Sequence, residues 1–303
     1  MKAASRLNRT LRRTLRRSAC LAALLAALGA DAPARQASPF AGSLLSSVTR
    51  RQPPPQQQPK EEESEVKPSR PGVANPAEIP EPGVLQLEFG YGSNFRARDV
   101  RAAHAVPVTL RYSAAKRLLL QLDFDAVRSE TDAQTRVRET DFGDTRVGFQ
   151  VVALEEDEGR PALAFAYFVK LPTADESKGL GTGRFDHKLV GLLSKKVGET
   201  DVDFNVAYLS VGREGEPGRE HGGQGAVSVT RDFKNHFGFE AELSGQSHDD
   251  VQPRGLFALG ALRYGAGRRV VFDAGARLGL NPEAPRVGLF AGLTVGVTRP
   301  SGR

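Results

Sequence analysis

Apolar residues occupy the odd-numbered positions of Leu85-Gln86-Leu87-Glu88-Phe89-Gly90-Tyr91, and the even-numbered positions are mostly polar. The same period of two recurs in residues 118–125, 202–206 and 237–243. Because successive side chains of a β-strand point to opposite faces, this period predicts strands with one apolar and one polar face. No sustained helical period follows residue 83. The sequence therefore predicts an all-β domain.

Twelve segments of this kind are long enough to cross a membrane as tilted strands. They are residues 83–92, 105–113, 117–127, 140–152, 161–171, 186–196, 200–211, 222–232, 236–246, 254–264, 269–279 and 286–297. A backbone inside hydrocarbon must satisfy its own hydrogen bonds, so a sheet that spans a membrane has to close on itself. The pattern predicts a transmembrane up-and-down antiparallel β-barrel of about 12 strands.

The connections between these segments alternate in length. The long ones lie near residues 93–104, 128–139, 172–185, 212–221, 247–253 and 280–285, the short ones near 114–116, 197–199, 233–235 and 265–268, and 153–160 is intermediate. Every second connection of an up-and-down barrel lies at the same end, and bacterial outer-membrane barrels keep their short turns in the periplasm. Both ends of the barrel segment are therefore expected on the periplasmic side.

The chain of 303 residues has a formal charge of +6 and a pI of about 9.6. Seven basic residues lie before residue 31, with no acid among them: Lys2, Arg6, Arg9, Arg12, Arg13, Arg16 and Arg17. Without them the chain is close to neutral, so the charge indicates a targeting segment and not a nucleic-acid partner. The apolar run 19–30 is too short to span a bilayer. Residues 1–34 are therefore predicted to be a secretory signal peptide, cleaved after Ala30 or Ala34.

Cys20 is the only cysteine of the chain. A lipoprotein is the alternative to a cleaved signal peptide, but the acceptor cysteine of a lipoprotein would end the apolar run, whereas Cys20 begins it. A mature chain without cysteine can form neither disulfides nor thiolate metal sites, which suits an exported protein.

Residues 35–80 differ in composition from the rest of the chain. The run Gln52–Pro59 is rich in Pro and Gln, and Lys60–Glu65 is charged. Such a segment cannot bury enough apolar surface to offset the entropy lost on ordering. It is predicted to be a disordered periplasmic leader, either a passive spacer or a plug or periplasmic contact, before a barrel domain at 81–303.

The two faces of the predicted strands differ in polarity. The apolar rows, expected to face lipid, are Leu85, Leu87, Phe89, Val106, Val108, Leu110, Leu118, Leu120, Leu122, Phe124, Val147, Phe149, Val151, Leu163, Phe165, Tyr167, Val169, Val287, Leu289, Leu293 and Val295. The residues expected to line the lumen are Glu88, Arg111, Asp123, Asp125, Arg146, Gln150, Asp203, Asn205, Glu240, Glu242, Arg263, Asp273, Arg277 and Arg286. Their mixed signs predict ion pairs around a narrow passage and not a charge-selective ring.

Three features fit this fold less well. The chain has no Trp and five Tyr, so the aromatic girdles of the membrane interfaces are expected to be thin. Pro107 removes a ladder hydrogen bond from its segment and must lie near a strand end or at a bulge. A polar tail, residues 298–303, follows the last segment, where outer-membrane barrels often end on an aromatic residue.

A family resemblance rests on one motif and its surroundings. The motif runs from Ala166 through Leu171, Pro172, Thr173, Ala174 and Asp175 to a glycine loop with Gly179, Gly181 and Gly183. Ser194-Lys195-Lys196, residues 203–208 and Asp141-Phe142-Gly143-Asp144 accompany it. The chain resembles the meta-pathway phenol-degradation family over residues 140–297 and, more weakly, 83–139. Ala174 stands where the family usually has Gly.

The resemblance implies an outer-membrane barrel of a transporter-like family, and it brings no catalytic residues with it. It points to small aromatic or apolar solutes. The motif also has a physical explanation of its own. Pro172 ends a strand because it cannot donate to a ladder, and the glycines permit left-handed turns in a long outer loop.

Other chemistries have weaker support. Residues 179–183 lack the Gly-Lys-Ser/Thr ending of a nucleotide loop, and no helix follows them. The histidines His104, His187, His221, His236 and His248 show no metal-ligand spacing, so neither a metal nor a cofactor is expected. The acidic run 155–158 could hold a divalent cation weakly, but such runs are usually solvated.

An outer-membrane rim hydrolase would be the enzyme with the best support. Its candidate pairs are His187 with Ser194, and His248 with Ser244 or Ser247, although no nucleophile elbow is present. The sequence favours a non-enzymatic channel or transporter for small solutes, in contact with membrane lipid and lipopolysaccharide. A closed structural barrel, a soluble periplasmic barrel and a barrel plugged by residues 35–80 would also fit the pattern. Neither the solute nor the oligomeric state follows from the sequence.

Overall fold

The computed structural model describes residues 66–97, 99–213, 217–248 and 253–298. Its strands are β1 (Leu85–Phe95), β2 (Val100–Ala115), β3 (Leu118–Asp132), β4 (Arg138–Asp141), β5 (Thr145–Leu154), β6 (Ala162–Leu171), β7 (Asp186–Val197), β8 (Thr200–Gly212), β9 (Arg219–Asp232), β10 (Phe237–Gln246), β11 (Gly255–Gly265), β12 (Val270–Gly279) and β13 (Val287–Gly296). A short 3-10 helix, η1, covers Glu176–Lys178. In the described residues no helix is long and apolar enough to cross a membrane.

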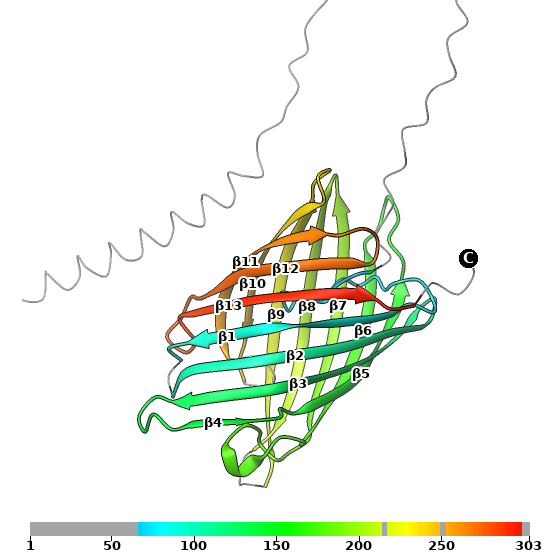
Figure 1. Cartoon of the computed structure of the whole chain (residues 1–303). Coiled ribbons are helices and arrows are strands. Elements are labelled where there is room, and N and C mark those ends of the chain that lie inside the picture. Colours follow the sequence, from blue (N-terminus) through cyan, green and yellow to red (C-terminus); the bar gives the residue numbers. More distant parts are fainter. Residues whose placement is uncertain (1–65, 98, 214–216, 249–252, 299–303) are drawn as a thin grey trace, which may run out of the picture. The chain divides into compact units, whose positions relative to one another are not determined.

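The strands form one closed antiparallel barrel (Figure 1). Consecutive strands pair along the chain except at β4, where β3 pairs with both β4 and β5, and β1 pairs with β13 to complete the ring. β4 and β5 pair with successive parts of β3 and occupy one position in the wall, so the barrel has twelve positions. The predicted outer-membrane barrel is therefore confirmed, because the pairing of β1 with β13 closes the sheet on itself as a membrane-spanning sheet requires.

All twelve predicted segments correspond to strands. The segment predicted at 140–152 differs in one respect, because two strands, β4 and β5, take the place of the single predicted strand. β4 pairs with the far end of β3, which with β2 extends beyond the rest of the wall. Pro107 lies at a register shift between β2 and β3, as its missing N–H requires.

The alternation of connection lengths is also present. Residues 116–117 and 198–199 are two-residue turns at one end of the barrel, and 172–185 is a long loop at the other. The first long connection, predicted at 93–104, is reduced to 96–99 because β1 and β2 both extend into it. The two ends are called the short-turn end and the long-loop end below.

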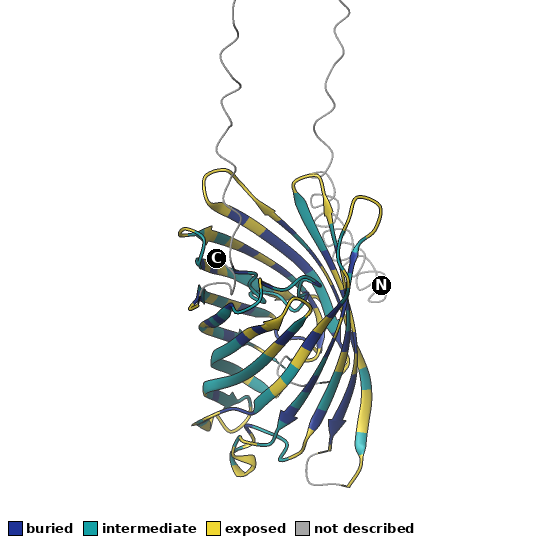
Figure 2. Ribbon diagram, turned by 90° about the vertical axis from the view of Figure 1, so that its right-hand side faces the viewer, coloured by how far each residue is buried: buried dark blue, intermediate teal, exposed yellow. Residues whose placement is uncertain are grey.

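Burial alternates along most of the strands and divides the wall into two faces, seen as stripes in Figure 2. Residues of the predicted lipid-facing rows are exposed on the outside, including Leu120, Phe149, Phe165 and Leu289. Buried polar residues occupy the alternate positions. An apolar outer belt on a closed barrel is the arrangement that an outer membrane requires, so the predicted location follows.

The five tyrosines lie at two levels of this belt, close to the ends of their strands. Tyr112 and Tyr264 are near the short-turn end, and the other three are near the long-loop end. Each of those three places its hydroxyl 2.6–2.8 Å from Nδ1 of a histidine on the next strand; the pairs are Tyr91–His104, Tyr167–His187 and Tyr208–His221. The tyrosines, although only five, therefore lie at both membrane interfaces.

The N-terminal expectations are tested only in part. The predicted signal peptide at 1–34, residues 35–65 of the leader, and the tail beyond residue 298 lie outside the described residues. Residues 66–80, predicted to be disordered, instead have a defined path and form hydrogen bonds to the inner face of the barrel. The reason lies in the chemistry of the lumen.

Candidate functional site: the lumen of the barrel

Residues 66–82, called the luminal segment, contain neither helix nor strand. Their contacts pass from β1 and β2 to β12, then to β10, β8, β7 and β5, so the segment crosses the inside of the barrel. Lys67 and Glu78 form an ion pair that joins its two ends. The segment colours blue to cyan in Figure 1, beside the end of the barrel where β1 begins.

Two buried glutamates of the wall bind backbone amides of the luminal segment. Glu88 accepts hydrogen bonds from the Ser69 amide at 3.0 Å and from the Ser69 hydroxyl at 2.9 Å. Glu242 accepts from the amides of Val73 and Ala74 at 2.6 and 2.8 Å. A buried carboxylate is costly without such donors, and a coil segment without a partner strand has free amides to supply them.

Arg70 is the main charged contact of the segment. Its Nε and Nη2 lie 3.1 and 3.2 Å from the two carboxylate oxygens of Asp273 on β12. A Cβ on Gly292 would lie 2.3 Å from Nη2 of Arg70, so this glycine leaves room for the guanidinium. Gly90, which pairs with Gly292 across the strands, also borders it. The two-pronged geometry is the strong form of an arginine–carboxylate contact.

Two amide side chains and one hydroxyl of the wall hold the rest of the luminal segment. Asn205 accepts from the Asn75 amide at 2.7 Å and donates to the Asn75 carbonyl at 2.9 Å. Gln150 donates to the carbonyls of Pro76 and Ala77, and Ser194 accepts from the Ala77 amide at 2.8 Å. The polar wall thus replaces the partner strand that the segment lacks.

Most of the predicted lumen residues lie on the inner face. Those that contact the luminal segment are Glu88, Arg111, Gln150, Asn205, Glu242 and Asp273. The others make contacts within the wall: Asp123 with Arg146, Asp125 with Arg128, Glu240 with Arg263, Asp203 with Ser194, and Arg277 with Asn94. Arg286 differs from the prediction, because it is exposed in the connection before β13. A role in contacting solute stays a prediction for the rest.

One part of the inner wall is apolar, which sequence reasoning missed. Alanine and larger aliphatic side chains, with one aromatic side chain, cover the inner face of β6–β8; this apolar strip comprises Ala162, Ala164, Ala166, Phe168, Val190, Leu192, Ala207 and Leu209. Ala77 of the luminal segment packs against it. The signal in the sequence is Ala162–Val169, where both alternating rows are apolar. The charged contacts of Glu88, Glu242 and Asp273 lie on other strands of the ring.

The loop motif closes the long-loop end of β6. Lys170, buried at the end of this strand, contacts Asp144 at 3.0 Å and Asp186 at 2.5 Å. Asp144 also accepts from the amides of Thr173 and Ala174, directly after Leu171 and Pro172. The three charged residues were not singled out as a site from the sequence, because Asp144 precedes β5 while Lys170 and Asp186 lie on β6 and β7.

The second half of the motif forms a turn. Asp175 caps η1, and Gly179 ends it in the left-handed region with φ of 68°. Gly183 has φ of 63°, and Gly181 lies against Asp144. A hydrogen bond from Lys178 to the Asp141 carboxylate raises the pKa of the lysine amino group. The motif therefore builds a fixed loop at the long-loop end.

Only one of the proposed Ser–His pairs is formed. Ser194 is bonded to Asp203 and the luminal segment, whereas His187 is bonded to Tyr167. Ser247 Oγ lies 2.9 Å from Nδ1 of His248, whose Nε2 lies 3.2 Å from Glu220. Within the described residues, no group of three potential His, Cys, Asp or Glu metal ligands occurs.

The family model "Putative MetA-pathway of phenol degradation" matches residues 69–297. The chain belongs to this family. The match begins inside the luminal segment, so the family region includes Arg70 as well as the barrel. No curated protein sequence matches the chain.

Solved structures of outer-membrane barrels are similar to this chain at low identity, and the first of them shows the same fold. The COG4313 outer membrane channel from Pseudomonas putida F1 is 12% identical, with 75% of this chain and 98% of that chain covered and a TM-score of 0.52. The NanC porin is 11% identical, with 71% and 100% covered and a TM-score of 0.47. The CymD monoaromatic hydrocarbon channel is 9% identical, with 72% and 90% covered and a TM-score of 0.42.

Proposed function

We propose that this chain is an outer-membrane channel for small solutes with an aromatic or apolar part, whose lumen is controlled by the luminal segment. The observation that carries this proposal is the division of the lumen into the apolar strip and a charged wall. Such an arrangement offers a solute one apolar surface and several hydrogen-bonding groups. The family description names phenol degradation, and phenol combines an aromatic ring with one hydroxyl.

The luminal segment occupies the region between these walls. Side chains of the wall hold it, and none of its residues takes part in the sheet. It can therefore leave the lumen without breaking the barrel ladder. We infer a channel that conducts when the segment is displaced. Lipid surrounds the outer belt, with lipopolysaccharide at the long-loop end.

Single-channel recording in planar bilayers tests the proposal. The mature chain is compared with a chain lacking residues 35–80, and phenol is then added as a current blocker. We expect larger or more frequent conductance steps after the deletion, and phenol should reduce the current. A folded barrel that stays silent in both forms would support a closed structural barrel instead.

A matched pair of substitutions tests the apolar strip. Leu209→Asn places an amide in the strip, whereas Leu119→Asn makes the same change at a buried inner position of β3 outside it. We expect the first variant to lose about tenfold in phenol block, because a buried unsatisfied amide opposes an apolar contact. Equal phenol block in both variants would contradict a role for the strip.

A second candidate function rests on Ser247, His248 and Glu220. In ester hydrolysis, Ser247 Oγ would attack the carbonyl carbon and pass its proton to Nδ1 of His248, while Glu220 holds Nε2. The leaving alcohol would take that proton, and water would then release the acid from the acyl-serine. Hydrolysis of p-nitrophenyl butyrate that disappears in His248→Ala would favour this function, and an unchanged low rate would exclude it.

A further inference from the structure

The outer wall at the long-loop end carries a second candidate site. Here β2, β3 and β4 extend past the ring; residues 100–106, 127–132 and 138–141 are called the rim extension. Register places Arg128, Glu130, Glu139 and Asp141 on its inner face, where Arg128 contacts Glu130 and Asp125. Its outer face carries Val127, Ser129, Thr131, Arg138 and Thr140. The acidic groups are therefore turned inward, and an arginine is turned outward.

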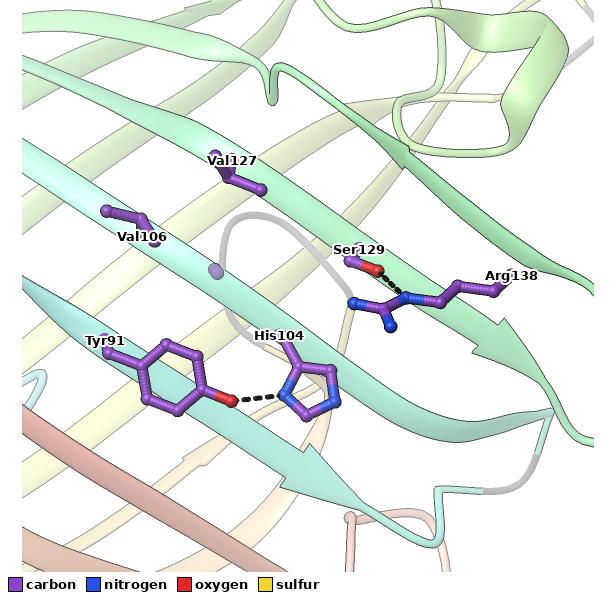
Figure 3. A pocket seen from close by; sticks show the side chains of 7 residues that line it. Tyr91, His104, Val106, Val127, Ser129 and Arg138 are labelled. Atoms are coloured by element: carbon purple, nitrogen blue, oxygen red, sulfur yellow. Dashed lines mark hydrogen bonds between the residues drawn. The ribbon is translucent and has the colours of Figure 1, made fainter.

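A cavity of about 310 Å³ lies on this outer face. Its lining combines apolar and polar side chains: Tyr91, His104, Ala105, Val106, Val127, Ser129 and Arg138 (Figure 3). Val106 and Val127 lie opposite each other on β2 and β3 and continue the apolar outer belt. The polar part lies at the edge of that belt, so the cavity joins an apolar surface to a hydrogen-bonding one.

Two donors remain available in the cavity. Nε of Arg138 donates to Ser129 Oγ at 2.8 Å, and in the described residues its two terminal nitrogens have no partner. Nδ1 of His104 lies 2.6 Å from the Tyr91 hydroxyl; when this hydroxyl donates to Nδ1, Nε2 of the ring carries the proton and is the donor toward the cavity. Figure 3 shows the guanidinium extending over β3 toward His104. A guanidinium with a neighbouring N–H donor binds phosphate oxygens well.

The position of the cavity indicates which phosphate would reach it. Its lining includes Tyr91 and His104, one of the Tyr–His pairs near the long-loop end, which faces the outer leaflet in the proposed orientation. A lipid there can place an acyl chain on Val106 and Val127 and its phosphate on Arg138. We propose that the cavity binds lipid A, the phosphorylated acyl glycolipid of the outer leaflet. This inference rests on the proposed membrane orientation but not on channel activity.

Lipid binding to the full mature barrel in detergent tests the proposal by native mass spectrometry. The probes are bis-phosphorylated hexa-acyl lipid A, the same lipid without phosphates, and phosphatidylglycerol. We expect lipid A to bind at least tenfold more tightly than either other lipid, because the Arg138 guanidinium and the His104 ring meet one phosphate. Equal binding of the dephosphorylated lipid or of phosphatidylglycerol would overturn the proposal.

Matched variants separate this cavity from the general surface. Arg138→Gln should weaken lipid A binding about tenfold, whereas Lys234→Gln, which removes a cation at the short-turn end, should not. His104→Asn should weaken it more than His187→Asn, since His187 has the same tyrosine contact but lies outside the cavity. Heat-modifiable migration on gels checks that each barrel is folded. Full binding by folded Arg138→Gln would refute the site, whatever the conductance measurements show.

Discussion

Arg70→Ala should loosen the luminal segment and raise the open probability of the channel. The substitution removes both hydrogen bonds to Asp273, whose side chain is 3% exposed, while that of Arg70 is 14% exposed. Removing one partner of a buried ion pair costs about 3–5 kcal/mol, and the lower figure applies where water can enter the lumen. About 3 kcal/mol corresponds to a roughly hundredfold shift toward the undocked segment.

Gly292→Ala tests the same contact without removing a charge. The new Cβ would lie 2.3–2.4 Å from the guanidinium atoms of Arg70, so Arg70 must move. Gly92→Ala is the control, because a Cβ there would meet no atom within 4 Å. We expect Gly292→Ala to raise the open probability of the channel, whereas Gly92→Ala should leave it unchanged.

The assay is single-channel recording at fixed voltage, with a double-mutant cycle of Arg70→Ala and Asp273→Ala. The double variant should gain less than the sum of the two single changes, since each removes the same contact. If Arg70→Ala and Gly292→Ala both fold and keep the wild-type open probability, the luminal segment does not control conduction.

Three further predictions concern the ends of the barrel. Tyr167→Phe should lower the free energy of unfolding by about 1 kcal/mol, because the contact with His187 is lost. Tyr112 has no such partner in the described residues, so Tyr112→Phe should leave the free energy of unfolding unchanged. Lys170→Met should leave two buried carboxylates unpaired, cost about 3–5 kcal/mol and expose the following loop to protease. NMR titration should find the pKa of Glu155 below the ordinary 4.5, because Lys116 and Arg117 favour its charged form, and Lys116→Ala should raise that pKa. The contact of Glu155 is thus present above its ordinary pKa and lost as pH falls through the lowered one.

Each of these has a contrary outcome. Equal free energies of unfolding for the two tyrosine variants would show that the Tyr–His pairs do not stabilise the barrel. A protease-resistant loop in Lys170→Met would show that the glycine turns hold it without the ion pairs. An ordinary pKa for Glu155 in the wild type would mean that the contact is absent in solution.

The sequence by itself determined the barrel. Its period of two assigns residues such as Leu87 and Glu88 to opposite faces, because a strand alternates its side chains whatever lies beside it. The alternation of connection lengths follows from up-and-down topology, and Pro107 required a bulge or a strand end. These signals are local, so they can be read without knowing which strands meet.

Only the tertiary structure decided the contents of the lumen. The luminal segment has too little apolar surface to order itself, so the composition of residues 66–80 predicted disorder, and the structure differs because the barrel wall binds them. Its order comes from partners far along the chain: Arg70 and Asp273 are separated by 203 positions. Closure and register bring such groups together across the barrel, whereas a local pattern specifies only which face each residue occupies. The same holds for the apolar strip and the cavity near Arg138, since both combine side chains from several strands.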